Sequence, residues 1–158
     1  MNFKQTTLCY IEDGTKYLML HRTKKENDEN RDKWIGVGGR FEDGESPEDC
    51  MMREVLEETG LTVTAFDYRG IVTFVSDVYP TEHMHLFVIH GYEGEIVADC
   101  DEGELARIEK ADLHALPMWE GDKIFLSLLD ERRPFFSLKL VYEKETLIEA
   151  RLDGRRIR

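Results

Sequence analysis

The sequence is short of basic residues. Its 158 residues include 21 Lys and Arg against 33 Asp and Glu, which gives a formal net charge of −12. This deficit argues against a nucleic-acid duplex as partner, because proteins that bind duplexes carry a basic patch or stripe. It also argues against an anionic membrane surface. It does not exclude an anionic small substrate, since a divalent cation held by carboxylates can invert the local charge.

Cysteines and long apolar runs are also scarce. Cys9, Cys50 and Cys100 lie far apart and form no CxxC pair, which favours reduced thiols packed as small apolar side chains. No apolar run approaches the roughly 20 residues that span a bilayer, and the first residues lack the apolar stretch of a signal peptide. Together these absences predict a cytoplasmic protein with no membrane partner.

The residues that are present suffice for one folded domain. Hydrophobic residues make up 41% of the chain, and a chain of this length buries enough surface to fold without disulfides or structural metals. It has no internal repeat, low-complexity tract or linker-like segment. We therefore expect residues 1–158 to form a single domain, either as a monomer or as a homodimer.

Turn signals and periodicity predict strand pairs interrupted by two helices. One helix is expected over 47–59, because Ser46 is a favoured N-cap residue and Gly60 a favoured stop. Apolar residues at helical spacing predict a second helix over 122–129. The pattern favours a mixed sheet with helices on its faces. The expected strands are 6–11, 16–21, 34–41, 64–69, 71–76, 83–90, 105–109, 136–142 and 146–152, with a helical turn at 111–116 and a frayed tail at 155–158.

The first helix carries three glutamates on one face. Glu54, Glu57 and Glu58 are spaced i, i+3 and i+4, so their side chains converge. Like charges at these spacings repel, and the last turn of a helix favours cations. Two explanations remain: a solvated acidic patch, or a site that binds a hard divalent cation such as Mg²⁺, with Arg53 neutralising one carboxylate.

The flanks of this helix favour a site that faces a crevice. Cys50 and Met51 lie one turn earlier on the side of the glutamates, and Met52 and Leu56 lie roughly opposite. A helix that is apolar on both sides is expected to be covered on both sides.

The spacing of residues 39–61 resembles the complete Nudix box, GX5EX7REUXEEXGU, where U is a bulky aliphatic residue. Softer similarity to MutT-type enzymes extends over 20–22, 34–39, 118–122 and 135–137. It is strongest to the branch that hydrolyses oxidised purine nucleoside triphosphates such as 8-oxo-dGTP. The fixed positions of the box are filled by Gly39, Glu45, Arg53, Glu54, Val55, Glu57, Glu58, Gly60 and Leu61.

The resemblance implies the Nudix fold, an α/β (α+β) architecture with an α/β/α sandwich around a mixed sheet. It implies a Mg²⁺-dependent hydrolase, with Mn²⁺ as the alternative ion, which converts a purine nucleoside triphosphate to the monophosphate and pyrophosphate. Other substrates stay open, among them dinucleoside polyphosphates, ADP-ribose and RNA 5′ ends. A nucleotide sensor without turnover is also open.

The resemblance also implies roles for residues of the box. Glu54, Glu57 and Glu58 match the acidic positions that bind the metal, and the Gly38 carbonyl is the expected backbone ligand. Arg53 matches the arginine that orients and neutralises these glutamates.

Further acidic roles are implied outside this helix face. Glu45 matches the glutamate that anchors the loop to the helix. Relatives add a glutamate from a downstream loop, for which Glu102 is the first choice and Glu104 the second.

Substrate contacts are assigned from residue type and place. Arg22, Lys24, Lys25 and Arg40 either meet the outer phosphates or form a plain solvated basic patch. Trp119 either stacks on a purine or belongs to the core beside the second helix. Asp122 is expected to accept a hydrogen bond from the purine edge. Two departures concern this pocket: Ile35 stands where the eukaryotic enzymes have asparagine, and Gly121 where they have an acid.

Overall fold

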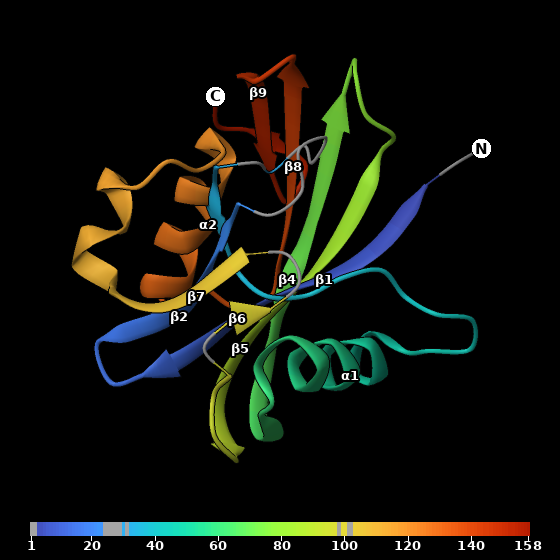
Figure 1. Ribbon diagram of the computed structural model, residues 1–158. Coiled ribbons are helices and arrows are strands. Elements are labelled where there is room, and N and C mark those ends of the chain that lie inside the picture. The colour runs from blue at the N-terminus through green and yellow to red at the C-terminus, as the bar shows by residue number, and fades with distance from the viewer. Residues whose placement is uncertain (1–2, 24–29, 31, 98, 101–102) are drawn as a thin grey trace.

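The computed structural model describes residues 3–23, 30, 32–97, 99–100 and 103–158. Within these residues a ten-stranded mixed sheet has the order β10-β9-β8-β4-β5-β1-β2-β7-β6, and β3 pairs with β2 (Figure 1). Two pairs, β1 with β5 and β4 with β8, are parallel, and the others are antiparallel. The strands are β1 (Lys4–Asp13), β2 (Lys16–Arg22), β3 (Trp34–Ile35), β4 (Thr62–Ser76), β5 (Glu82–Glu93), β6 (Asp99–Cys100), β7 (Gly103–Glu109), β8 (Phe136–Glu143), β9 (Thr146–Leu152) and β10 (Arg155–Arg156).

Two α-helices and one 3₁₀ helix complete the fold: α1 (Pro47–Thr59), α2 (Glu120–Asp130) and η1 (Lys110–Ala115). The bounds predicted for α1 are confirmed. The Ser46 side chain accepts the Asp49 N–H, the Asp49 carboxylate accepts the Ser46 N–H, and Gly60 ends the helix in the left-handed region at φ 80°. These caps satisfy backbone groups that a helix leaves unpaired at its ends.

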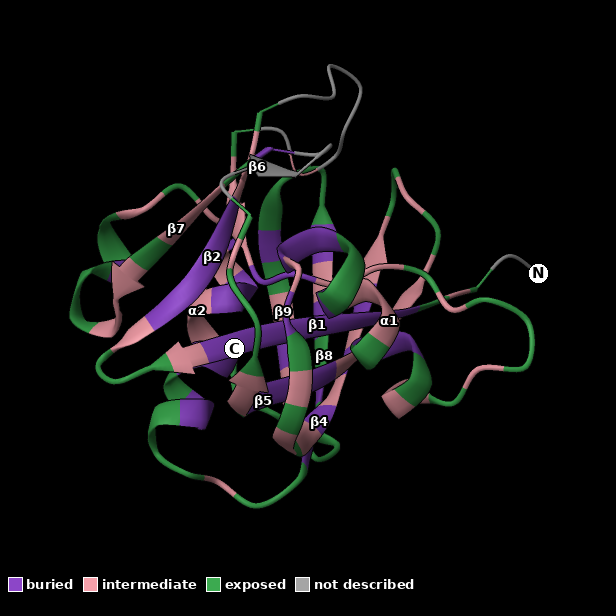
Figure 2. Cartoon of the chain, turned by 60° about the horizontal axis from the view of Figure 1, so that its bottom comes forward, coloured by how far each residue is buried: buried purple, intermediate pink, exposed green. Residues whose placement is uncertain are grey.

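The two α-helices cover opposite faces of the sheet. Alternation along β1 sends Cys9 towards α1, where it joins the buried cluster of Val55 and Phe87. The next residue, Tyr10, faces α2 and packs in the cluster of Phe125. Figure 2 shows both interfaces as buried stretches of strand and helix. The expected α/β/α sandwich around a mixed sheet is therefore confirmed.

Three strand predictions need correction. Segments 64–69 and 71–76 belong to the single strand β4, which passes Gly70 without a break. Regular pairing in 34–41 is limited to β3, followed by isolated bridges at Val37 and Arg40. The tail is not frayed, because β10 pairs with β9.

No helix in the described part of the chain has both the length and the apolar character needed to cross a membrane.

Candidate active site

Arg53 gathers three glutamates around one guanidinium. Its Nε and Nη2 donate to the two oxygens of Glu45, at 2.7 and 2.8 Å. Its Nη1 donates to Glu54 at 2.8 Å and to Glu57 at 3.3 Å. Bidentate hydrogen bonds between a guanidinium and a carboxylate are strong because both groups are charged, and the planar guanidinium fixes their geometry. Arg53 therefore sets the position of the loop before α1 and of two carboxylates on α1.

Glycines let the preceding strand segment pass close to these carboxylates. The Gly38 N–H donates to Glu58 Oε2 at 2.7 Å. A Cβ at Gly38, which has φ 149°, would lie 2.0 Å from the Thr7 carbonyl oxygen. A Cβ at Gly39 would lie 2.6 Å from the Glu54 carboxyl group. Side chains at these positions would collide with β1 or with the carboxylate.

The expectation that α1 is covered on both sides is wrong. Met52 and Leu56 are 42% and 51% exposed, so the outer face of the helix meets solvent. Among the glutamates, Glu58 is buried and the Glu54 side chain is 15% exposed, whereas that of Glu57 is 58% exposed. The acidic face thus runs from the crevice beneath the glycine-rich segment out to solvent.

Pairing with Arg53 changes the pKa of Glu45, the residue that anchors the loop to α1. The Arg53 hydrogen bonds lower the pKa of Glu45 to about 2, and the Glu42 backbone N–H adds to this effect. The Glu45 and Glu54 carboxylates in turn raise the pKa of Arg53. The loop before α1 is therefore held by an ionised pair at neutral pH. This confirms the anchoring contact expected of Glu45.

The donor chemistry of this cluster fits a hard divalent cation. Three carboxylates, from Glu45, Glu54 and Glu57, share the guanidinium of Arg53, and the Glu58 carboxylate accepts the Gly38 N–H. Such oxygen donors match Mg²⁺ or Mn²⁺. Within the described residues no three Asp, Glu, His or Cys side chains are grouped closely enough to form a ready-made centre.

Of the two residues that the sequence offers as the downstream acid, one lies among the described residues. Glu102 lies outside the described residues. Glu104, the second choice, is exposed on β7 and pairs in register with His21 of β2.

The residues predicted to contact the phosphates come from separate parts of the chain. Arg22 ends β2 opposite Gly103 of β7. Arg40 is exposed, and its carbonyl accepts a hydrogen bond from Arg53 at 3.0 Å. Lys24 and Lys25 lie outside the described residues.

Trp119 belongs to the core and also to the wall of a pocket. It is only 6% exposed and packs edge-on against Phe74 and Tyr142 at centroid distances of 5.4 and 4.9 Å. Its Nε1–H donates to Asn30 Oδ1 at 2.8 Å, and Lys33 Nζ lies 4.7 Å from the ring centre. The core interpretation of Trp119 is therefore confirmed, and stacking on a purine stays a prediction.

The pocket beside Trp119 is mainly apolar, with a few polar groups. Asn30 and Glu82 were not predicted from the sequence because they lie in segments with no recognisable motif. In the fold, Asn30 accepts a hydrogen bond from Trp119 and Glu82 lines the same pocket. The side chains around the pocket are Leu8, Asn30, Ile35, Phe74, Glu82, Met84, Trp119 and Asp122.

Among the described residues that line this pocket, Asp122 has the one buried carboxyl group. Burial raises its pKa to about 8, an effect that Lys33 opposes and Glu82 reinforces. The carboxyl is therefore mostly protonated at neutral pH and can both donate and accept a hydrogen bond. The prediction of an acceptor is thus too narrow.

Comparison with known proteins places the chain among relatives of known architecture. Residues 2–129 match the NUDIX domain family. The chain is 29% identical to the Uncharacterized Nudix hydrolase YvcI of Bacillus subtilis, over 98% of each chain. It is 33% identical to an oxidized purine nucleoside triphosphate hydrolase of Danio rerio, over 77% of this chain and 78% of the relative. A MutT protein from Bacillus halodurans superposes with a TM-score of 0.85 at 27% identity, covering 96% of this chain and 99% of the other.

A shorter match is to a relative with a different named activity. Over 53% of its length the chain is 40% identical to an NAD-capped RNA hydrolase of Pseudomonas syringae, and the match covers 30% of that protein.

The Glu45–Arg53 pair predicts a pH-dependent contribution to stability. The folded-state pKa of Glu45 lies at about 2, below the ordinary carboxyl value. The pair therefore stabilises the fold above the unfolded-state pKa and loses this effect as the pH falls towards the folded-state value. We expect Glu45→Gln to lower the free energy of unfolding at pH 7, and the difference from wild type to shrink between pH 5 and pH 3. Urea denaturation measures both; a difference that stays constant would contradict the assignment.

Proposed function

The chain belongs to the Nudix hydrolase family, whose members are pyrophosphohydrolases acting on phosphorus-containing anhydrides, and from this premise we propose that it hydrolyses purine nucleoside triphosphates. The products are the nucleoside monophosphate and pyrophosphate. Oxidised nucleotides such as 8-oxo-dGTP are the proposed physiological class, which makes the activity one of nucleotide-pool sanitation. The observation that carries this choice is the buried, protonatable Asp122 beside Trp119 in an apolar pocket.

We assign the metal site to Glu54, Glu57 and Glu58, with the Gly38 carbonyl as backbone ligand and Glu102 as the downstream acid. Glu54 and Glu58 lie against the glycine-rich segment, and Glu57 extends towards solvent where a substrate can approach. Mg²⁺, or Mn²⁺, bound there would neutralise the phosphate oxygens and lower the pKa of the attacking water.

The side chains of the site have separate tasks in this scheme. Arg53 is a positioning residue, because it acts on Glu54 and Glu57 through hydrogen bonds and fixes the loop through Glu45. A carboxylate of the α1 cluster accepts the proton that the attacking water loses. Arg22 and Arg40 meet the outer phosphates of the substrate.

The pocket supplies the recognition of the base. A purine stacked on Trp119 would gain roughly 1–3 kcal/mol by comparison with other base-stacking sites. The neutral Asp122 offers an O–H donor and a carbonyl acceptor to the purine edge. Ile35, which lines the pocket, stands at the position of the asparagine in the eukaryotic enzymes and offers the purine edge no hydrogen bond. Asp122 therefore supplies more of the polar recognition here.

Removing one acidic oxygen tests the catalytic assignment. We expect Glu57→Gln to lower kcat for a purine nucleoside triphosphate at least 100-fold, because the amide is a poor ligand for a hard cation and a poor proton acceptor. The melting temperature should change little, because Glu57 is exposed. Met52→Gln, on the exposed outer face of the same helix, serves as the matched control and should keep wild-type kcat. Near-normal turnover in folded Glu57→Gln would contradict the metal assignment.

The protonation state of Asp122 gives a second test. With a pKa of about 8, the protonated form dominates below pH 8 and is lost above it. We therefore expect kcat/KM of the wild type, divided by that of Asp122→Asn, to fall as the pH rises from 7 to 9.5 with 8-oxo-dGTP as substrate.

Taking the ratio removes the pH dependence of the water activated on α1, because both proteins share it. A ratio that is flat across this range would show that the Asp122 proton plays no part in base recognition, while leaving the hydrolytic chemistry in place.

A further inference from the structure

A second cavity lies apart from the α1 carboxylates and from the Trp119 pocket. It is a cleft of about 730 Å³, a size typical of small-molecule sites. Buried Tyr17, Val88 and Leu129 line its apolar part. The cleft forms where β4 extends beyond β8, since β8 pairs only with residues 70–76 of β4. None of its described lining residues belongs to α1.

Cationic side chains gather here although the whole chain has a net charge of −12. Some of them are already neutralised. Lys110 forms an ion pair with Glu12 and lies over the Tyr17 ring. Arg133 Nη2 lies 3.1 Å from a carboxylate oxygen of Asp153. The acids on the cleft itself are Glu12, Asp67 and Asp130.

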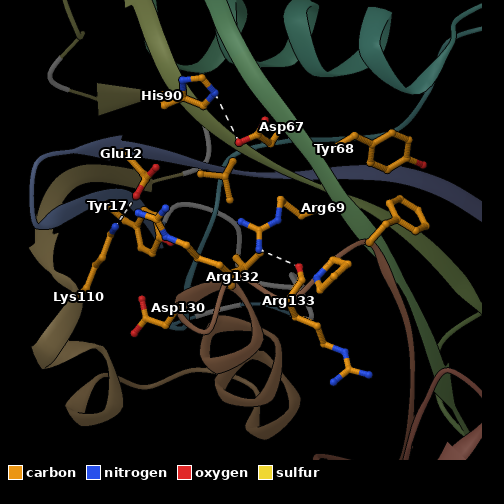
Figure 3. Close-up of a pocket in the computed structure, with 14 residues that line it drawn as sticks. Glu12, Tyr17, Asp67, Tyr68, Arg69, His90, Lys110, Asp130, Arg132 and Arg133 are labelled. Carbon is orange, nitrogen blue, oxygen red and sulfur yellow. Dashed lines mark hydrogen bonds and ion pairs between the residues drawn. The ribbon is translucent and has the colours of Figure 1, made fainter.

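Two arginines remain available to an anion. Arg69 is half-buried, and its Nη2 donates to the Arg133 carbonyl oxygen at 3.1 Å. Among the described residues, no carboxylate forms an ion pair with Arg69 or with Arg132. Figure 3 shows Arg69 entering the cleft from β4 and Arg132 entering from the loop after α2. A half-buried guanidinium that has only a carbonyl partner favours a bound anion.

The backbone at Arg132 gives an independent reason to look for a ligand. Helix α2 ends in a Schellman motif, in which the Arg132 N–H donates to Leu129 and the Arg133 N–H to Leu128. Arg132 occupies the left-handed position of this motif, at φ 54°, where glycine is the usual residue. A long cationic side chain held in a strained conformation at the mouth of a cleft is typical of a functional position.

The rim of the cleft adds aromatic surface. Tyr68 and Phe135 pack edge to face at 5.2 Å, and Phe135 is 55% exposed. Exposed ring faces beside guanidinium groups suit a ligand that carries both an aromatic ring and a charged oxyanion.

We propose that this cleft is a second ligand site, which binds a phosphate-bearing small molecule through Arg69 and Arg132. Two guanidinium groups that approach from different elements suit a tetrahedral phosphate with several acceptor oxygens. A nucleotide, with its base against the Tyr68–Phe135 rim, is one source of that phosphate, and inorganic pyrophosphate is the other.

The test is an amide-resolved NMR titration of the full chain with inorganic pyrophosphate, and separately with GMP. EDTA is included so that no cation draws the anion to α1. We expect saturable shifts at the amides of Arg69, Arg132 and Arg133 rather than at Gly38 and Gly39. Tighter binding of GMP than of pyrophosphate would identify a nucleotide as the ligand; the reverse order would support the anion site with pyrophosphate as the ligand.

Substitution at the strained position gives a variant that should fold. Arg132→Gly removes the side chain where the backbone favours glycine, so its melting temperature should stay equal or rise, while Kd should weaken at least tenfold. Lys144→Gly is the matched control, because Lys144 also has φ 54°, lies outside the cleft lining and loses the same charge; its Kd should stay within twofold of wild type. Equal Kd values for wild type and Arg132→Gly, shifts confined to Gly38 and Gly39, or no saturable binding would each overturn the proposal.

Discussion

The acidic cluster on and before α1 depends on the contact between Arg53 and Glu45. This fork fastens the loop that precedes α1, and the same guanidinium holds Glu54 and Glu57 in place. Without it, three glutamates on one helical face would repel one another and turn their carboxylates to water. The glycines complete the arrangement, since Gly38 and Gly39 allow the strand segment to approach the carboxylates of Glu58 and Glu54.

The two faces of the sheet divide the proposed work. Helix α1 lies on one face and carries the acidic residues, whereas α2 begins at the pocket of Trp119 and Asp122 on the other. The carboxyl groups at the two places have opposite pKa shifts. The Arg53 guanidinium keeps Glu45, in the loop before α1, ionised; in the pocket, burial outweighs the opposing effect of Lys33 and keeps Asp122 mostly protonated at neutral pH. A carboxyl side chain can thus supply a charge on one face and a neutral donor on the other.

Local signals in the sequence predicted α1 to the residue, because Ser46, Asp49 and Gly60 fix its ends by short-range hydrogen bonds. The family resemblance implied that Arg53 orients the α1 glutamates, and its hydrogen bonds to Glu54 and Glu57 agree with this, whereas the Glu58 carboxylate accepts the Gly38 N–H. Properties set by tertiary neighbours were not predictable in this way. Periodicity alone could not show that Met52 and Leu56 face solvent, and the basic tail gave no sign that β10 would pair with β9.

The pocket beside Trp119 shows the same limit. Residue type suggested Trp119 and Asp122, but the partners of Trp119 come from distant segments, and the raised pKa of Asp122 depends on burial that only the packed fold creates.

The central claim is the hydrolysis of purine nucleoside triphosphates at the α1 site. It is tested most directly by kcat/KM values with Mg²⁺ for 8-oxo-dGTP, dGTP, diadenosine polyphosphate, ADP-ribose and NADH, with product analysis. The account predicts monophosphate and pyrophosphate from the triphosphates, and a value for 8-oxo-dGTP at least tenfold above that for dGTP, about 1.4 kcal/mol of transition-state discrimination. Preferred hydrolysis of ADP-ribose or another diphosphate conjugate would contradict it.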